Sequence, residues 1–482
     1  MHIGRRPPWA AAGALAGLFA FPLIAANEVT DTQAALDRIS AQSMRGHLSF
    51  LASDLLEGRN SPSRGLDIAA EYIAAQFRRI GLEEAGDDGY FQTAKMATQE
   101  QSKTGWRILL SLNGKEFGLK DDDFAGLVVK QVDFPALPVF KVTKDSDISP
   151  DLENAAVILD AASRRLLRKV RAMKPAAVLT ISTRKPRIPA RLVEREGERS
   201  APAQVYVKND EWTQMAETLP GGRTEAKLAL TAPAPGETPA LLRNVIGVLR
   251  GSDPVLKDTY FFLTAHYDHI GMKSSGEGDR VYNGANDDGS GTVSVIEIAA
   301  ALASLEHRPK RSIVFMAVFG EEEGLIGSKY YANHPIFPLA KTVADLNLEQ
   351  LGRTDDLAGP QVAAVSVTGF TYSDLGKILA DAGARTGIRI REDETRSDEF
   401  FARSDNLSFA EKGVPAHTIG VAFEFPDYHE VGDEWPKIDY YNMVKVDRMI
   451  ATAVLTVANS PVPPKWNAES SKTEPYRKAI HP

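Results

Sequence analysis

The spacing of apolar residues changes twice along the chain, and the changes predict its organisation. Near the N-terminus apolar side chains recur at helical spacing, which predicts helices over residues 40–56 and 66–80. Residues 100–235 instead hold short β-like runs separated by Pro, Asp and Gly. From residue 241 apolar strands alternate with helices, a pattern typical of a mostly parallel sheet covered on both faces. The predicted fold class is therefore α/β with an inserted, β-rich domain.

The predicted strands of the last part define where a ligand could bind. The strands lie at 245–248, 260–264, 312–319, 343–348, 362–367 and 416–421. The helices lie at 290–305, 325–332, 373–386 and 443–458. Because ligands in such sheets bind at the carboxyl ends of the strands, the residues just past these strands are the candidates for chemistry.

The first residues form a separate segment. Arg5 and Arg6 precede an apolar run from Trp9 to Ala26 that holds no acidic residue. A basic n-region, an apolar h-region and small residues at the cleavage site are typical of a signal peptide. An uncleaved membrane anchor is the alternative, but a spanning helix needs about 20 apolar residues, and Pro22 interrupts this run. We expect a signal peptide over 1–26 and a protein that is periplasmic or secreted.

The remaining patterns predict one discontinuous main domain with an insert. Residues 30–95 and 241–460 form the predicted main domain, and residues 100–235 form the insert. A Pro-rich segment at 232–239 is typical of a linker. Residues 461–482 are polar, and we expect a frayed tail.

Composition and charge exclude several classes of protein. Hydrophobic residues make up 43% of the 482 positions and charged residues 25%, as in ordinary globular proteins. The formal charge of −8 argues against a dedicated nucleic-acid binder. Residues 161–200 are rich in Lys and Arg but poor in aromatic residues that could stack on bases, so we interpret them as solvated helix surface rather than as a nucleic-acid or membrane patch. Cysteine is absent, so any metal must be held by His, Asp and Glu.

Metal-capable side chains follow the strand at 260–264. His266 could offer one ring nitrogen to a metal, and Asp268 could hold the other N–H and so orient the ring. The Gly-rich acidic loop at 283–292 precedes a helix, so a helix N-cap and a phosphate site are alternative interpretations. Two adjacent acids and the lack of Gly-Lys-Ser/Thr oppose phosphate binding. An Asp in such a tight loop can bridge two cations, because a carboxylate has two oxygens.

Three consecutive acids, Glu321–Glu323, follow the strand at 312–319. A helix N-terminus favours each acid by only ~0.3–1 kcal/mol, and crowding them raises their mutual repulsion unless a cation is present. A metal ligand beside a general base explains the cluster best. Glu349 ends another strand, and His429 lies in a loop before the last helix with Asp433 as a possible partner. Nitrogen and oxygen donors without sulfur fit zinc, or Mn or Co.

The order of these motifs resembles metallopeptidase family 28. The matching elements are His-x-Asp at 266–268, Gly-Ala-x-Asp-Asp-x-Ser-Gly at 284–291, Glu-Glu-x-Gly-Leu-x-Gly-Ser at 321–328, Asn-Leu-Glu at 347–349 and Tyr-His at 428–429. The resemblance covers residues 40–95 and 241–458, and the run from Leu48 to Arg59 is similar to that of bacterial members. It implies a fold of the zinc-exopeptidase type, with the insert where many members carry a protease-associated domain.

The resemblance also implies a site for two zinc ions. The implied roles are His266 and Glu349 on one zinc, Glu322 and His429 on the other, Asp287 as the bridge and Glu321 as the general base. The family usually has Asp at the position of Glu349, so we expect ligation there with altered geometry. Tyr428 could stabilise the oxyanion or simply pack against its neighbours. Asp405 and Glu424 are candidates for binding a free α-amino group.

The implied function is that of an exported aminopeptidase acting on peptides or small proteins. A carboxypeptidase or another amidohydrolase on the same fold is one alternative. A non-catalytic binding module and a two-metal phosphatase or nuclease are others, but all five ligand positions hold competent side chains. We expect no nucleic-acid partner and no membrane span once the signal peptide is removed, and the sequence does not determine the oligomeric state.

Overall fold

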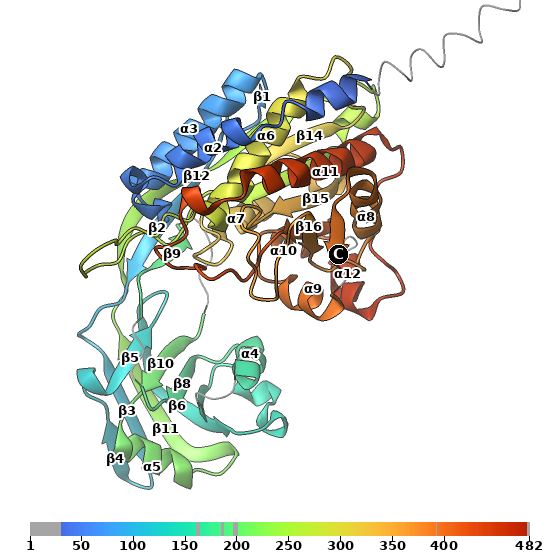
Figure 1. Ribbon diagram of the computed structural model, residues 1–482. Helices are drawn as coiled ribbons and strands as arrows, with labels where there is room; N and C mark the ends of the chain where they lie inside the picture. Colours follow the sequence, from blue (N-terminus) through green and yellow to red (C-terminus); the bar gives the residue numbers. More distant parts are fainter. Residues whose placement is uncertain (1–29, 161–163, 185–187, 196–200, 392, 480–482) are drawn as a thin grey trace, which may run out of the picture. The chain divides into compact units, whose positions relative to one another are not determined.

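Two compact units make up the chain in the computed structural model. One unit consists of Met1–Ala94 and Leu242–Pro482, and the other of Lys95–Leu241 (Figure 1). The structure describes residues 30–160, 164–184, 188–195, 201–391 and 393–479. The predicted signal peptide at 1–26 therefore lies outside the described residues. Within those ranges, no helix has both the length and the apolar character needed to cross a bilayer.

A mixed sheet forms the centre of the first unit. Its order is β17 (Arg389–Arg391), β16 (Ala364–Val367), β18 (Ala416–Gly420), β15 (Thr342–Leu348), β13 (Tyr260–His266), β14 (Ser312–Val318), β12 (Gly236–Leu249) and β2 (Phe91–Glu100). The central strands β18, β15, β13 and β14 run parallel to one another. β12 runs antiparallel to β14, and β16 runs antiparallel to β18. The predicted α/β class is confirmed, with the parallel pairing concentrated in the middle of the sheet.

The central strands are apolar along almost their whole length because both faces of the sheet are covered. Every residue of β13 and β14 is buried, and a strand buried on both faces has no solvent side on which polar residues could alternate. The register places His266, the last residue of β13, opposite Val318, the last residue of β14. The polar residues that follow these strands therefore emerge at one edge of the sheet.

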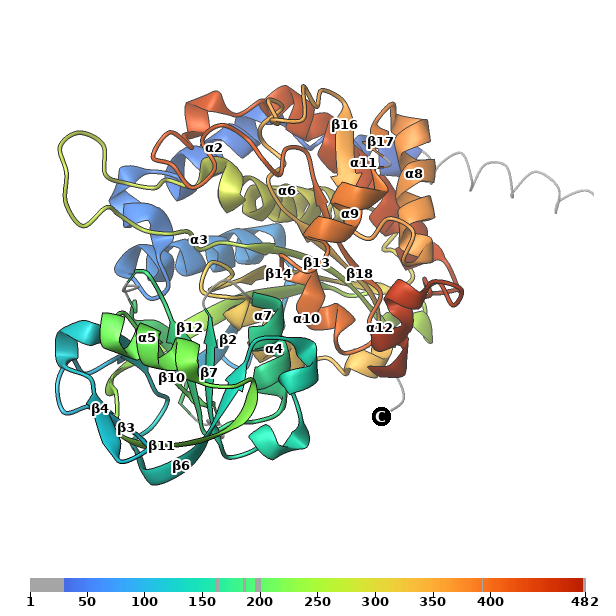
Figure 2. The ribbon, with the colours of Figure 1, turned by 90° about the horizontal axis from the view of Figure 1, so that it is seen from below.

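Helices cover both faces of this sheet (Figure 2). On one side lie α2 (Ala41–Leu51), α3 (Arg64–Ile80), α6 (Gly291–Ala303) and α11 (Tyr440–Asn459), with α8 (Asp374–Thr386) packed against α11. On the other side lie α7 (Ile326–Asn333), α10 (Asn406–Ala410) and α12 (Glu474–Ala479). The double coverage expected from the alternating pattern is confirmed.

The first predicted helix is shorter than the sequence indicated. It ends at Leu51 instead of residue 56 and is followed by the short turn η1 (Asp54–Arg59). Leu55 extends the apolar spacing in the sequence, but its side chain is 86% exposed. The chain leaves the helical path here because residues of η1 bind loops of the sheet edge, as described below.

The expectation of a frayed C-terminal tail is wrong for residues 461–479. Trp466 is buried and its ring N–H donates to the carbonyl of Gly413 at 2.8 Å. Its ring stacks on Tyr476 with centroids 5.3 Å apart. The polar composition of the segment conceals two aromatic residues, Trp466 and Tyr476, which both pack against Phe401 and so fix the segment to the rest of the first unit.

The second unit is built on an eight-stranded sheet. Its order is β4 (Lys115–Gly118), β3 (Arg107–Leu112), β11 (Gly222–Ala232), β6 (Val132–Val142), β7 (Ala156–Asp160), β8 (Ala177–Ile181), β10 (Ala203–Val207) and β5 (Phe124–Leu127). β9 (Arg191–Glu194) pairs with residues 96–99 of β2. Of the predicted linker at 232–239, residues 233–235 connect β11 to β12, and the remaining residues belong to the ends of these two strands.

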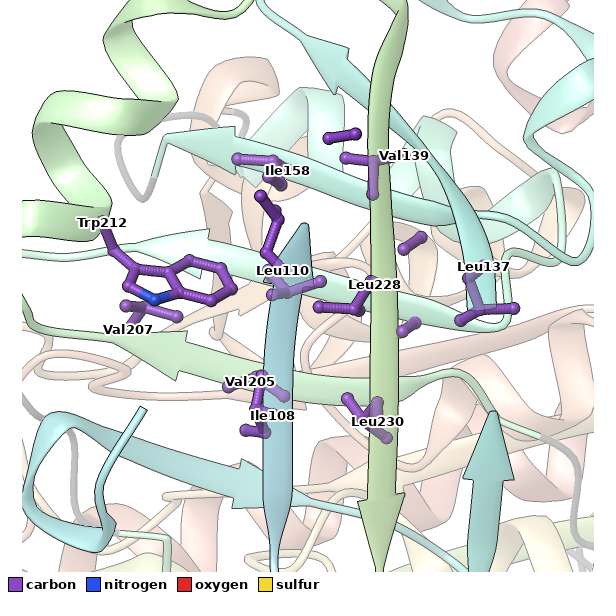
Figure 3. Packing of buried hydrophobic residues seen from close by; sticks show 14 of the residues in the cluster. Ile108, Leu110, Leu137, Val139, Ile158, Val205, Val207, Trp212, Leu228 and Leu230 are labelled. Carbon is purple, nitrogen blue, oxygen red and sulfur yellow. The ribbon is translucent and has the colours of Figure 1, made fainter. Parts of the chain in front are cut away.

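Two helices complete the described part of this unit. Trp212 of α5 (Asp210–Thr218) is fully buried and packs in a cluster with Leu110, Ile158 and Leu228 (Figure 3). In α4 (Arg164–Ala172), Lys169 is 48% exposed and pairs with Asp145 at 2.7 Å. This pairing agrees with the interpretation of the basic stretch as solvated helix surface.

Candidate metal site and active site

The candidate residues come together at the carboxyl edge of the central strands. His266 ends β13, the acids at 321–322 follow β14, and Glu349 follows β15. Asp287 lies in the short turn η6 (Ala285–Ser290), which leads into α6, and His429 lies in the loop before α11. Because β13, β14 and β15 are parallel neighbours, their following loops meet at one place.

His266, Asp287 and Glu349 form the first of two ligand groups. The ring Nε2 of His266 lies 3.3 Å from Oδ1 of Asp287. One atom from each of the three residues lies within 4.8 Å of the others. Glu349 therefore reaches the group despite its longer side chain, and its carboxylate also hydrogen-bonds to Ser404.

Asp287 also belongs to the second ligand group, with Glu322, His429 and His269. Nε2 of His429 lies 3.1 Å from Oδ2 of Asp287 and 3.2 Å from Oε2 of Glu322. Nδ1 of His269 lies 2.8 Å from Oε1 of Glu322. The sequence analysis missed His269, although a second histidine one residue after Asp268 in the same strand-end loop was a signal that could have found it.

Asp287 is the residue shared by both groups. Its Oδ1 faces His266 and its Oδ2 faces His429, so the two oxygens of one carboxylate point to two separate sets of donors. This is the arrangement that a carboxylate bridging two metal ions requires. The structure thus brings all five ligands named from the sequence into one cluster.

Asp433 and Asp288 hold the loop that carries Asp287. Asp433 was expected beside His429, but its carboxylate accepts the backbone N–H groups of Asn286 and Asp287 at 2.9–3.0 Å. Oδ1 of Asp288 accepts the backbone N–H of Gln350 at 3.0 Å and so ties the loop to the end of β15. The position of the shared carboxylate is therefore fixed from both sides.

Asp268 links the first ligand to the candidate base. Its Oδ1 lies 3.5 Å from Nδ1 of His266, but the hydrogen bond of this ring nitrogen is with the backbone carbonyl of Asp268 at 3.2 Å. Oδ1 accepts the backbone N–H of Glu321 at 3.1 Å. Asp268 therefore contacts the ring of His266 mainly through its backbone and holds the backbone of Glu321 through its carboxylate.

The cluster attracts positive charge. Burial raises the pKa of Glu321 well above its ordinary value and that of Glu349 to about 7. Burial alone would lower the pKa of His429, but the carboxylates of Asp287 and Glu322 raise it to about 10. Crowded buried carboxylates of this kind are stabilised by a cation, either a proton on a neighbouring ring or a metal ion.

The donor atoms themselves fit a metal. Nε2 of His266, Nδ1 of His269, Oε1 of Glu322 and Nε2 of His429 are buried and face donors or acceptors of the same cluster at 2.8–3.3 Å, but within the described residues none of them forms a hydrogen bond of regular geometry. A buried polar atom left without a partner costs about 1–3 kcal/mol, and coordination to a metal removes that cost. Imidazole and carboxylate donors without sulfur suit zinc in a site that keeps open positions.

A cavity of about 210 Å³ opens beside the cluster. Asp287, Glu321 and Glu349 line one part of it. The rest of the wall is mixed: the apolar and aromatic residues are Leu357, Phe400, Phe423, Phe425 and Tyr428, and the polar ones are Gln350, Thr368, Arg403, Ser404, Thr418 and Glu424. Bound substrate would therefore meet the ligand cluster together with both aromatic and polar side chains.

The remaining predicted residues differ in how they meet this cavity. Tyr428 lines it, and its ring stacks on His429 with centroids 4.0 Å apart. Glu424 also lines the cavity, but its carboxylate pairs with Arg396 at 3.0 Å. Asp405 is fully buried, is not part of the cavity wall and accepts a hydrogen bond from Ser328. The structure thus does not place Asp405 where it could bind a substrate amine.

Known proteins share both the sequence motifs and the fold. The family model described as Peptidase family M28 matches residues 244–454. Over these residues, which are less than half of the chain, the sequence is similar to peptidase family M28. The resemblance inferred from the motifs is thereby confirmed, and the family match contains all five members of the predicted ligand set.

Individual M28 relatives show how far the similarity extends. A probable zinc metalloprotease of Pyricularia oryzae is 27% identical over 269 residues, which cover 46% of this chain and 51% of that protein. Leupeptin-inactivating enzyme 1 of Streptomyces exfoliatus is 28% identical over 253 residues, covering 47% and 51%. This chain therefore spans about half the length of these curated relatives. The solved aminopeptidase from Aneurinibacillus sp. strain AM-1 shares the fold, with a TM-score of 0.53 at 18% identity over 88% of this chain and 95% of that one.

Proposed function

We propose that this protein is a zinc metallopeptidase that holds two zinc ions and removes N-terminal residues from peptides. The observation that carries the proposal is the shared position of Asp287, whose two oxygens face His266 and His429. Glu321 lines the same cavity and is free to meet a substrate there. The proposed ligands are His266 and Glu349 for one zinc, Glu322 and His429 for the other, and Asp287 for both.

The zinc ions and the protein residues have separate tasks in this proposal. When bound, zinc lowers the pKa of a water molecule to about 7 and polarises the carbonyl that is attacked. The carboxylate of Glu321 takes the proton from the attacking water and passes it to the leaving amine. Asp268 holds the backbone of Glu321 in place through the 3.1 Å hydrogen bond. Tyr428 stacks on His429 and lines the cavity, so its hydroxyl is a candidate oxyanion donor.

The cavity supports an exopeptidase that accepts an apolar terminal residue. Leu357 and the phenylalanines of its mixed wall would receive one side chain while the scissile bond lies at the ligand cluster. The solved structure with this fold is described as an aminopeptidase, and the Streptomyces relative is named for inactivating leupeptin. Both names favour peptide substrates for this chain.

The first test combines metal analysis with hydrolysis of leucyl-p-nitroanilide. We expect close to two zinc ions per chain, loss of hydrolysis in the presence of a chelator, and recovery when zinc, Mn or Co is added back. An N-acetylated leucyl substrate is the control, because it has the same side chain but no free amine. Two metals with activity only on blocked or C-terminal substrates would replace the aminopeptidase by a carboxypeptidase or amidohydrolase. Absence of metal after reconstitution would overturn the proposal.

We also propose that residues 1–26 direct export. The basic start of this segment and its apolar run without acidic residues support the proposal. In a bacterial host we expect the periplasmic protein to begin near residue 27 by mass spectrometry. The variant Leu18→Asp, which places a charge in the apolar run, should stay in the cytoplasm. Recovery of an intact N-terminus in the membrane fraction would favour an anchor instead.

A further inference from the structure

Arg59 lies behind the ligand cluster and has no role in the function proposed above. It ends η1, outside the part of the chain that matches the M28 family. Its side chain is only 1% exposed. The run Leu48–Arg59 was noted in the sequence for its similarity to bacterial members, but that similarity assigned it no chemistry.

The guanidinium of Arg59 binds the two loops that carry metal ligands. Its Nε donates to the carbonyl of Tyr267 at 2.8 Å, between His266 and Asp268. Its Nη1 and Nη2 donate to the carbonyls of Asn283 and Gly284 at 2.7 and 3.0 Å, in the segment that leads to Asp287. A further bond goes to the carbonyl of Leu51, at the end of α2. A single side chain thus joins the start of the two loops to the end of α2.

The backbone of the same segment adds two more contacts to the first loop. The carbonyl of Arg59 accepts the N–H of His269 at 3.3 Å, and the carbonyl of Gly58 accepts the N–H of Gly271 at 3.1 Å. Gly58 has φ +67°, and a Cβ built there would lie 2.2 Å from the carbonyl oxygen of Gly271. The close approach therefore requires glycine at this position.

The hydrogen bonds of Arg59 go to carbonyls even though several buried carboxylates are near. Asp268, Asp287, Asp288 and Asp433 all act electrostatically on the guanidinium. Burial lowers the pKa of Arg59 to about 10, so the side chain remains charged at neutral pH. The planar guanidinium of Arg can donate to several fixed acceptors at once, whereas Lys has a single ammonium group.

We propose that Arg59 is a positioning residue that holds the loops of His266 and Asp287 in the geometry that binds zinc. The proposal rests on the zinc site of the proposed function. It implies that metal affinity depends on the segment 51–61, which lies outside the region that defines the family match. Partners that orient metal ligands in this way typically contribute 10–100-fold to metal affinity.

The alternative is that Arg59 acts only through its charge. A positive charge beside two cations opposes their binding, so its removal would then tighten zinc binding. A positioning role predicts the opposite sign. The positioning role also predicts that Lys at position 59, which keeps the charge but lacks the planar guanidinium, does not restore zinc binding. The two roles can therefore be separated by one pair of variants.

The test compares Arg59 with Arg311, the other arginine among the largest fully buried side chains. Arg311 precedes β14, at the end of the strand opposite the ligand cluster, and its Nη2 donates to the carbonyl of Ser460 at 2.9 Å. The variants are Arg59→Lys, Arg59→Met, Arg311→Lys and Arg311→Met. The zinc dissociation constant is measured by competition with a chromophoric chelator, and the thermal midpoint is measured with and without zinc.

We expect both Arg59 variants to bind zinc roughly 10–100-fold more weakly than the wild-type protein. We also expect zinc to raise their thermal midpoint by less than it raises that of the wild type. The Arg311 variants should lose stability but keep the original zinc affinity. If Arg59→Met does not fold, the Arg59→Lys result decides alone. Unchanged or tighter zinc binding in the Arg59 variants would overturn the positioning role. Failure of the original chain to bind zinc would instead overturn the proposed function.

Discussion

Replacement of Asp287 by Asn should remove the bridge between the two metal ions. Asn keeps the size of the side chain but loses its charge and one of the two oxygens that face His266 and His429. Loss of one partner from a buried ionic arrangement costs about 3–5 kcal/mol, which corresponds to roughly 10²–10⁴-fold in affinity. We therefore expect zinc content to fall from two to at most one per chain and hydrolysis to become undetectable.

The matched control for this substitution is Asp355→Asn. Asp355 pairs with Arg353 and its side chain is 51% exposed, outside both ligand groups. We expect this variant to keep both zinc ions and full activity. Retention of two zinc ions by Asp287→Asn would contradict the bridging assignment, even if activity were lost. Elemental analysis after dialysis, together with kcat for the nitroanilide substrate, distinguishes these results.

Replacement of Glu321 by Gln should abolish turnover and leave the metal content unchanged. Gln has the same shape, so the hydrogen bond from the backbone N–H of residue 321 to Asp268 can persist. The amide cannot accept the proton of the attacking water, and a positioned general base typically contributes about 10²–10⁴-fold to the rate. We expect kcat to fall by that factor, with both zinc ions still bound.

Glu323→Gln provides the control for the base, because Glu323 is the exposed member of the three consecutive acids. The kcat of Glu323→Gln should stay close to that of the wild-type protein. Full activity in Glu321→Gln would show that another group is the base. Loss of zinc from Glu321→Gln would mean that this residue is a ligand and that the roles of Glu321 and Glu322 have to be exchanged.

Local sequence predicted the strands at the centre of the sheet and the places where chemistry occurs. β13 and β14 are buried on both faces, so they appear as apolar runs whose ends are visible without a structure. Burying acidic or histidine side chains in a hydrophobic core costs free energy. Acids and histidines directly after such apolar runs are therefore easily recognised in the sequence as candidates for a site. This is why His266, Glu322 and Glu349 could be named from the sequence.

The errors of the sequence analysis share one cause. Leu55 fits the helical spacing and yet is 86% exposed, and Trp466 lies in a polar tail and yet is buried. In both places the local pattern was overruled by packing against a segment far away in the sequence. In the Pro-rich stretch at 232–239 only residues 233–235 connect two strands, and the flanking residues already belong to β11 and β12.

The sequence by itself determined the fold class and the resemblance to the family, and it predicted five of the six residues that the structure brings together in the two ligand groups. Only the tertiary structure decided which oxygen of Asp287 faces which histidine, that His269 meets Glu322, and that Asp433 binds backbone instead of His429. It also decided that Arg59 binds the carbonyl of Tyr267, a partner 208 positions away along the chain. Local sequence patterns reflect only burial and backbone preference. These contacts depend instead on where the loops lie relative to one another, which is fixed only when the sheet has assembled.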